Sequence, residues 1–400
     1  MQLQPEKTFI LTCLKELIDY KSEDLCINDI NLKELDWVWL IKQCNEQGLL
    51  GFIAIALQKK HLFTFLEPTI QEILKTYLAI YKRSFRYKQE QFQKISNILK
   101  KENIPFIPLK GSALIFLIYE NIPYRQMDDI DIFVKHEDLA RCAELFLQEG
   151  FTHVRYFEKY LWHEKILHDT SLKSEIRSIL GRIGLKRDDL LVELHWNPRY
   201  LIAGEFVELD WSSIWSRSFL DSSFGSNAYM LSHGDQALFL LVHLAESYHP
   251  NLKQILDLAL IMNKYSILSA DLQKSIAFNF SPPVVRHLSQ FIDLIQEFFN
   301  MDLDRKMFSP KTQELFELFF LNSSAIQSYK NWNPLKTISS QLSFITSPWE
   351  RILFCLGHLF PDLEYYKNKN VNSCYFNHWK NLMFDVKRFL LYGLKNCFKH

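Results

Sequence analysis

Hydrophobic residues in the first hundred positions of this 400-residue chain recur at helical spacing. Leu14, Leu17 and Ile18 stand at positions i, i+3 and i+4, so they share one face of a helix. A second apolar face is formed further along by Ile73, Tyr77, Ile80, Tyr81 and Phe85. The pattern predicts a helical N-terminal region over residues 1–100 that serves packing, because none of these positions carries obvious chemistry.

Short apolar runs replace the helical pattern from about residue 103 onward. Residues 104–109 (IPFIPL) are bracketed by proline, as at the start or edge of a strand, and residues 130–134 (IDIFV) have the alternation of a strand. Further strands are predicted at 151–157, 160–168 and 190–196, and helices at 113–119 and 137–148, the second ending at Gly150. This order of elements predicts an α/β or α+β core over residues 101–215.

Helical periodicity returns in the last part of the chain and predicts a helical C-terminal region over residues 216–400. Two strongly periodic segments are separated by His249-Pro250-Asn251, where proline breaks the pattern. Helices are predicted at 236–247, 252–264, 284–299, 313–321 and 378–397, with a polar loop at 331–346.

Composition and charge exclude several classes of protein. The 46 Lys and Arg residues balance 46 Asp and Glu residues, so no overall basic field draws the chain onto nucleic acid or an anionic membrane. The seven cysteines form no C-x-x-C pair, so a zinc ribbon or a redox motif is not indicated. No apolar stretch approaches the ~18 residues that a membrane-spanning helix needs. We therefore expect a cytoplasmic protein with no membrane partner.

Gly111 and Ser112 lie between a predicted strand and a predicted helix. The first turn of a helix has unpaired N–H groups and the positive end of the helix dipole, which together suit phosphate. Glycine lets the backbone approach phosphate oxygens closely, and the serine hydroxyl can add a donor. Taken alone, a Gly-Ser pair is a common turn, so this feature needs support from others.

Asp129 and Asp131 lie at positions i and i+2 of a predicted strand and therefore point to the same face. Two adjacent carboxylates repel each other, and one should hold a proton unless a cation lies between them. Mg²⁺ is the expected cation because it prefers oxygen ligands and retains waters and phosphates in its coordination shell. The alternative is a solvated acidic pair at a strand end. Asp128 points to the other face and is not counted as a ligand.

Glu193 provides a third carboxylate on the strand predicted at 190–196. If that strand pairs beside residues 130–134, Glu193 could complete a three-carboxylate metal site with Asp129 and Asp131. His195 lies two residues further on the same face, where either a direct role or a supporting hydrogen bond is open.

These residues together resemble the polymerase-β nucleotidyltransferase superfamily, in which Gly-Ser, a helix, Asp-x-Asp on a strand and a later carboxylate strand follow one another. More narrowly, L-K-G-x-A-L at 109–114, R-x-x-x-D-I-D at 125–131 and E-L-H-W at 193–196 are similar to a family of uncharacterised bacterial nucleotidyltransferases. Residues 233–261 and 359–367 also fit that family. The resemblance implies an α+β fold with a polymerase-β-like core, a mixed sheet with flanking helices, between helical N- and C-terminal regions.

The resemblance also implies the chemistry. Asp129 and Asp131 would hold two Mg²⁺ ions, and Glu193 would share one of them. An acceptor hydroxyl would attack the α-phosphate of a nucleoside triphosphate such as ATP, and pyrophosphate would leave. Glu193 would help to deprotonate the acceptor. The implied partners are the nucleoside triphosphate and a hydroxyl-bearing acceptor, which could be a small molecule, a peptide or protein, or a tRNA.

Basic residues are expected around the triphosphate. Lys110 precedes the Gly-Ser turn, and Arg125 lies four residues before Asp129. Lys253 and Asp257 are four residues apart on a predicted helix, which places them on one face. The resemblance favours a phosphate contact for Lys253, with Asp257 orienting it, whereas the plain alternative is a surface helix pair.

Two other functions compete with the enzyme reading. A catalytically degenerate member of the same fold would bind a nucleotide or a partner without turnover, and loss of one carboxylate would indicate it. A helical interaction scaffold would not bring Gly111, Ser112, Asp129, Asp131 and Glu193 together in space. All three carboxylates are present in the sequence, which favours a metal-dependent nucleotidyltransferase.

Overall fold

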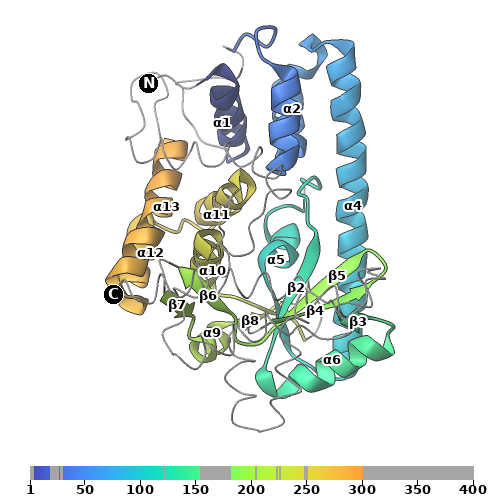
Figure 1. Cartoon of the computed structure of the whole chain (residues 1–400), viewed down its shortest axis with the longest axis vertical. Coiled ribbons are helices and arrows are strands. Elements are labelled where there is room, and N and C mark those ends of the chain that lie inside the picture. Colours follow the sequence, from blue (N-terminus) through green and yellow to red (C-terminus); the bar gives the residue numbers. More distant parts are fainter. Residues whose placement is uncertain are drawn as a thin grey trace, which may run out of the picture.

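The computed structural model describes residues 4–18, 27, 30–120, 122–153, 182–202, 205–221, 224, 227–246 and 251–300 (Figure 1). Several predicted elements lie outside the described residues: the strand at 160–168, the helices at 313–321 and 378–397, and the loop at 331–346. Residues 359–367, which entered the family resemblance, also lie outside them.

The N-terminal part of the chain is helical. Its helices are α1 (Pro5–Leu17), α2 (Trp37–Glu46), α3 (Leu50–Lys59) and α4 (Pro68–Lys101), with a 3₁₀ turn, η2 (Phe63–Phe65), before α4. The Asp36 side chain caps α2 by accepting a hydrogen bond from the backbone N–H of Trp39. Proline occupies the first position of α4, where no N–H is needed, and this 34-residue helix runs along one side of the molecule (Figure 1).

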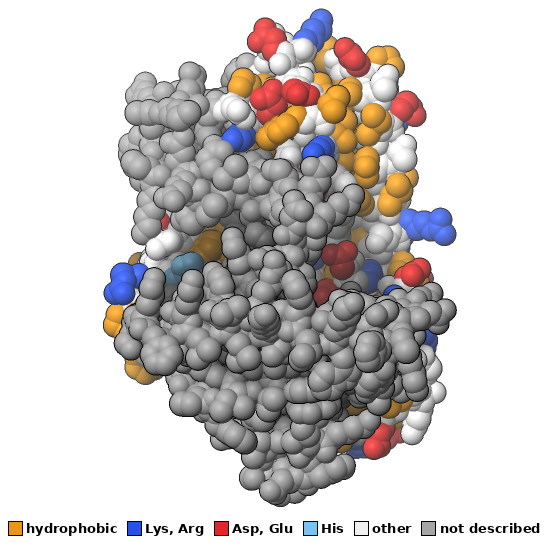
Figure 2. Space-filling model, viewed as in Figure 1, with side chains coloured by type: hydrophobic (Ala, Val, Ile, Leu, Met, Phe, Trp, Pro, Cys, Tyr) orange, Lys and Arg blue, Asp and Glu red, His pale blue; other side chains and the backbone are white. Residues whose placement is uncertain are grey.

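The buried face of α4 differs from the predicted one. Leu74, Leu78, Tyr81 and Phe85 are buried, whereas Ile80 is 54% exposed. The predicted face included Ile80 because the helical spacing from Tyr77 admits it, but the buried side of the helix is the one that carries Leu74 and Leu78. Hydrophobic side chains gather at the surface on the α4 side of the molecule (Figure 2).

Five strands form a mixed sheet in the order β1-β2-β5-β4-β3. The strands are β1 (Phe106–Pro108), β2 (Asp129–Val134), β3 (Thr152–His153), β4 (Arg182–Arg187) and β5 (Leu190–His195). β2 and β5 are parallel neighbours, and the other pairs are antiparallel. The sheet and its surrounding helices make this an α+β protein. The pairing of β5 beside β2 confirms that these two predicted strands are adjacent.

Helices and hairpins complete the sheet region. α5 (Lys110–Leu117) follows β1 and begins before the predicted helix, so Gly111 and Ser112 lie in its first turn rather than ahead of it. The 3₁₀ turn η3 (His136–Asp138) precedes α6 (Leu139–Gln148), after which Gly150 adopts a φ of 84° that ends the helix. Further along are β6 (Arg199–Ile202), β7 (Glu205–Glu208), α9 (Trp211–Arg217), β8 (Phe219–Leu220) and β9 (Tyr229–Met230).

Four helices follow the last strand: α10 (His233–Glu246), α11 (Leu252–Lys264), α12 (Ser269–Asn279) and α13 (Pro282–Asn300). α11 starts with a capping box in which the Asn251 and Gln254 side chains each accept a hydrogen bond from the other residue's backbone N–H. α10 packs against α11 and against β6. None of the helices in the described ranges has the length and apolarity that crossing a membrane requires.

Phe92 joins the long helix α4 to the sheet region. Its fully buried ring packs against the rings of Phe106, Phe116 and Phe224, with centroid distances of 6.1, 5.2 and 6.1 Å. Ser96, one turn further along α4, donates a hydrogen bond to the backbone carbonyl of Phe224. These contacts fix the side of α4 that faces the sheet.

Removing the Phe92 ring should therefore be costly. We expect Phe92→Ala to lower the free energy of unfolding by about 3–5 kcal/mol, because it leaves a cavity in the core. Phe278→Ala is the matched control, since Phe278 is 89% exposed. Urea unfolding followed by circular dichroism measures both, and equal losses for the two variants would contradict the assignment of Phe92 to the core.

Candidate metal and nucleotide site

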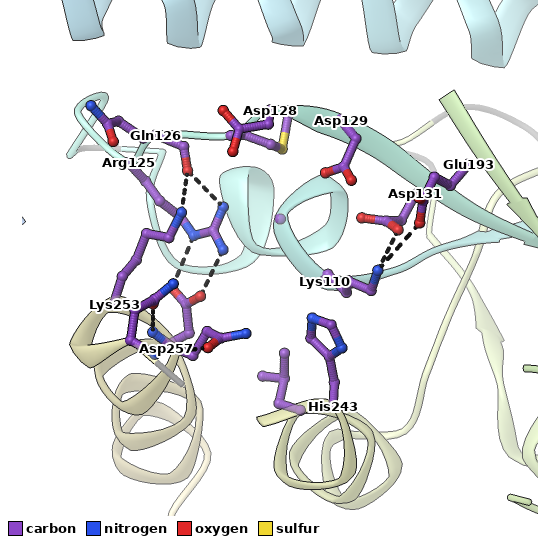
Figure 3. A pocket seen from close by; sticks show the side chains of 15 residues that line it. Lys110, Arg125, Gln126, Asp128, Asp129, Asp131, Glu193, His243, Lys253 and Asp257 are labelled. Atoms are coloured by element: carbon purple, nitrogen blue, oxygen red, sulfur yellow. Dashed lines mark hydrogen bonds and ion pairs between the residues drawn. The ribbon is translucent and has the colours of Figure 1, made fainter. Parts of the chain in front are cut away.

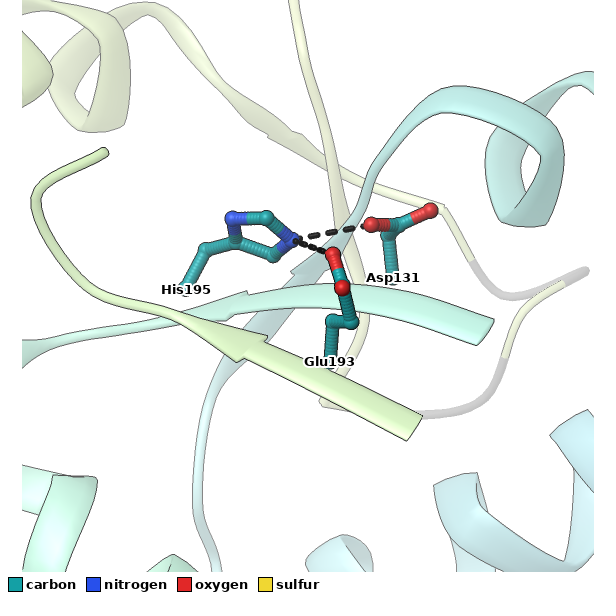
Figure 4. A group of neighbouring side chains, drawn as sticks. All are labelled: Asp131, Glu193 and His195. Carbon is teal, nitrogen blue, oxygen red and sulfur yellow. Dashed lines mark hydrogen bonds and ion pairs between the residues drawn. The ribbon is translucent and has the colours of Figure 1, made fainter. Parts of the chain in front are cut away.

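The parallel register of β2 and β5 sets Asp131 directly opposite Glu193. Both side chains point to the same face of the sheet, and His195 lies on that face two residues further along β5 (Figure 4). Ile130 and Ile132 alternate with Asp131 and are fully buried beneath the opposite face. One ligand atom each from Asp131, Glu193 and His195 lie within 4.8 Å of one another, so this group could hold a metal ion.

A lysine ammonium group already lies between the two carboxylates. Lys110 Nζ is 2.6 Å from Asp131 Oδ1 and 3.6 Å from Glu193 Oε2 (Figure 3). Lys110 is the first residue of α5, and its φ of 47° is in the left-handed region. That conformation costs a non-glycine residue about 1–2 kcal/mol, so the surrounding structure must enforce it.

Ser112 connects α5 to the central strand. Its hydroxyl oxygen accepts a hydrogen bond from the backbone N–H of Asp131 at 2.8 Å, and the Leu109 N–H donates to the Asp131 carbonyl at 3.0 Å. Ser112 is completely buried. Its side chain is therefore directed at the backbone of β2, where it fixes the position of Asp131.

His195 has one ring nitrogen with partners and one without. Nε2 lies 2.9 Å from Asp131 Oδ1 and 3.4 Å from Glu193 Oε2. Nδ1 is buried and has no hydrogen-bond partner among the described residues. A metal-bound histidine normally donates its second N–H to an acceptor, and Nδ1 has none here. The arrangement favours a proton on Nε2, donated to Asp131, so that His195 positions the carboxylate and the oxygens remain for a metal.

Asp129 lies two residues before Asp131 on β2, so both side chains are on the same face of the sheet and both line one cavity. The charge of Asp131 and burial together raise the pKa of Asp129 to about 7. Burial opposes ionisation of Asp131 as well, but the Lys110 ammonium and the His195 hydrogen bond hold its pKa below the usual value. Of the three carboxylates, Asp129 is thus the one whose charge its described neighbours stabilise least.

A cavity of about 280 Å³ opens beside these carboxylates (Figure 3). Its lining includes the carboxylates Asp128, Asp129, Asp131, Glu193 and Asp257, the cations Lys110, Arg125 and Lys253, and His243, Gly111 and Gln126. Ser112 is not in this lining, because its side chain is buried against the backbone of β2. Acidic and basic groups thus meet across one cavity, as a metal–polyphosphate ligand requires.

Arg125 is held by Asp257 through two hydrogen bonds, from Nε at 2.9 Å and from Nη2 at 2.6 Å. The Tyr119 hydroxyl donates to the same carboxylate at 2.7 Å, and all three side chains are buried. A Cβ on Gly111 would lie 2.6 Å from Arg125 Nη1, so only glycine permits this close approach of α5 to the guanidinium.

The predicted orientation of Lys253 by Asp257 differs from what the structure shows. The hydrogen bonds of Asp257 go to Arg125 and Tyr119, whereas Lys253 Nζ donates to the backbone carbonyl of Gln126 at 3.1 Å. Helical spacing places Lys253 and Asp257 on one face, but it carries no information on a guanidinium 132 residues away in sequence. Burial lowers the pKa of Lys253 to about 8.

Sequence patterns gave no indication of two other contributors. Lys88 on α4 donates to the backbone carbonyl of Asp128 at 2.6 Å, across 40 residues of sequence. Tyr119 is the last residue of the helix predicted at 113–119, and its hydroxyl donates to Asp257 on α11. Both contacts join residues that are far apart in sequence, so local spacing offers no signal for them.

The α+β fold and the carboxylate cluster beside a cation-lined cavity agree with a comparison against known protein families. The family model described as "Uncharacterised nucleotidyltransferase" matches residues 33–300. The chain belongs to this family of nucleotidyltransferases, which confirms the resemblance found in the sequence. No curated protein and no solved structure matches the chain.

Neutralising Asp257 should destabilise the protein strongly. We expect Asp257→Asn to lower the free energy of unfolding by about 3–5 kcal/mol, because Arg125 would remain buried without its counter-charge. Asp271→Asn is the control, since Asp271 pairs with Lys274 at the surface. Urea unfolding tests both variants, and a loss at Asp257 no larger than at Asp271 would show that the buried pair does not hold this region.

The proton of His195 can be located directly. We expect ¹⁵N–¹H correlation spectra to show the neutral ring protonated at Nε2, because only Nε2 has an acceptor. His195→Gln, which keeps a donor, should then retain Mn²⁺ binding, whereas His195→Leu should weaken it by about 10–100-fold. A proton on Nδ1, or equal losses in the two variants, would make His195 a metal ligand instead.

Proposed function

We propose that this protein is a metal-dependent nucleotidyltransferase that moves a nucleoside monophosphate from a nucleoside triphosphate to a hydroxyl acceptor, releasing pyrophosphate. The observation that carries the proposal is the register of β2 and β5, which sets Asp131 opposite Glu193 at the edge of a cavity lined by Lys110, Arg125 and Lys253. The sheet, with α5 between β1 and β2, supports a polymerase-β-like core over residues 101–215.

The residues present suit a divalent metal. Asp129, Asp131 and Glu193 would hold two Mg²⁺ ions, since carboxylate oxygens are the ligands that Mg²⁺ prefers. The close approach of a lysine ammonium group to Asp131 and Glu193 supports the binding of a cation at this position. When bound, the metal ions would neutralise charge on the α-phosphate and on the leaving oxygen.

The chain's own residues would perform the remaining tasks. Lys110, Lys253 and Arg125 would provide positive charge for the phosphates, and Gly111 would let the backbone of α5 approach them. The acceptor oxygen would form a bond to the α-phosphorus while the bond from that phosphorus to the bridging oxygen breaks. The proton of the acceptor hydroxyl would pass to Glu193, and pyrophosphate would leave with the bridging oxygen.

Ser112 and Asp257 contribute to this proposal by positioning other groups. Ser112 holds the backbone of Asp131, and Asp257 holds Arg125 at the wall of the cavity. Ser112 was expected to donate to the phosphates and Asp257 to orient Lys253, whereas their hydrogen bonds support positioning of Asp131 by Ser112 and of Arg125 by Asp257.

Substitution of either aspartate of β2 should reduce nucleotide transfer, but the two substitutions should change stability differently. We expect both Asp129→Asn and Asp131→Asn to reduce nucleotide transfer at least about a hundredfold, because the charge clamp on the phosphate is lost. Without metal, Asp131→Asn should lower stability by about 3 kcal/mol, since Lys110 and His195 lose their partner. Asp129→Asn should leave stability unchanged or raise it, because it removes a repelling charge.

The assay is incubation with radiolabelled nucleoside triphosphates, Mg²⁺ and cell extract, combined with thermal melts in chelator. Glu137→Gln, in the exposed turn after β2, is the control for both readouts. Transfer at the parental rate by either aspartate variant would refute the proposed metal site. Nucleotide binding without any labelled product, in the parent protein, would instead indicate the degenerate binding module.

A further inference from the structure

Lys110 combines two features that a simple phosphate-binding lysine would not need. Its backbone is held in the left-handed region at a φ of 47°, and its ammonium group points away from the other cations of the cavity, toward Asp131 and Glu193 (Figure 3). The Lys110, Asp131 and Glu193 side chains are only 12%, 2% and 16% exposed, so little solvent screens this cluster.

The ammonium group competes with a metal ion that would bridge Asp131 and Glu193 through the oxygens it contacts. Mg²⁺ binds carboxylate oxygens at about 2.0–2.1 Å and fills a compact octahedral shell. Lys110 Nζ already lies 2.6 Å from Asp131 Oδ1 and 3.6 Å from Glu193 Oε2, which is the space between the two acidic groups. A metal that bridges them must therefore displace the ammonium group.

The displaced group can move into the cavity. Lys110 and Gly111 both line it, and Arg125 and Lys253 lie at the side opposite Lys110 (Figure 3). A lysine carries a compact charge on a flexible four-carbon stem, so its ammonium can swing while the backbone of α5 stays in place. Leaving the carboxylates brings Lys110 closer to two other cations, a position that becomes favourable when a polyanion lies between them.

We propose that Lys110 is an exchangeable counter-ion: it neutralises Asp131 and Glu193 when no metal is bound, and a divalent metal displaces its ammonium group into the cavity, where it binds the triphosphate. This inference rests on the metal site of the proposed function. It has a consequence that the function alone does not imply. Metal binding releases Lys110 to the phosphate site, which adds to the direct attraction between metal and phosphate, so part of the reciprocal coupling between the two ligands depends on Lys110.

The experiment measures binding rather than turnover. Calorimetry follows Mn²⁺ alone, and separately inorganic triphosphate with and without saturating Mg²⁺, which removes any influence of the base. In Lys110→Met we expect Mn²⁺ to bind about tenfold more tightly than in the parent, because its competitor is gone. Triphosphate with Mg²⁺ should bind about tenfold more weakly, and the coupling between the two ligands should become smaller than in the parent.

Lys253→Met is the matched control. It removes the same charge from the same cavity, but Lys253 donates to the Gln126 carbonyl and not to Asp131 or Glu193. It should weaken triphosphate binding and leave the affinity for Mn²⁺ close to that of the parent. Lys110→Arg keeps a cation in place and should not tighten Mn²⁺ binding.

The outcomes separate this inference from the proposed function. If the parent binds Mn²⁺ and Asp131→Asn does not, but Lys110→Met binds it no more tightly than Lys253→Met, the exchange is overturned and the metal site stands. If the parent binds no Mn²⁺, both fail. Should Lys110→Met unfold without metal, thermal melts replace calorimetry: Mn²⁺ must raise its Tm more than that of the parent, and an equal or smaller rise overturns the exchange.

Discussion

The rest of the site depends on the parallel pairing of β2 and β5. It brings the acidic groups of Asp131 and Glu193 onto one face of a sheet whose other face is packed with isoleucine and valine. Two carboxylates in such a place repel each other and lose hydration, which would destabilise the fold without compensating groups. Lys110 and His195 supply that compensation from α5 and from the end of β5.

A second layer of contacts keeps the segment before β2 in position. Arg125 is fixed by Asp257 on α11, and the backbone carbonyls of Gln126 and Asp128 accept hydrogen bonds from Lys253 and Lys88. These donors come from α4 and α11, which lie on either side of the sheet region in sequence. The positions of Asp129 and Asp131 therefore depend on helices that lie outside the sheet region.

Strand alternation was sufficient to predict that Asp129 and Asp131 share a face, and the carboxylate strand at Glu193 was correctly expected beside them. Strand alternation is a dependable guide because it depends only on local backbone geometry. It fails for contacts that close over long sequence separations, such as Arg125 with Asp257, because no local pattern specifies them. Ser112 shows an intermediate case: its place at the start of a helix was foreseen, but its partner, the Asp131 N–H, depends on how α5 packs on β2.

The hydrogen bonds of Lys88 and Lys253 bear on how this chain can be divided for study. A fragment limited to residues 101–215 would contain the whole sheet and all three acidic groups, but it would lack Lys88, Lys253 and Asp257. In such a fragment the Arg125 guanidinium would lose its buried counter-charge and two backbone carbonyls would lose their donors. The smallest useful piece for expression or crystallisation must therefore run at least from the start of α4 to the end of α11, residues 68–264.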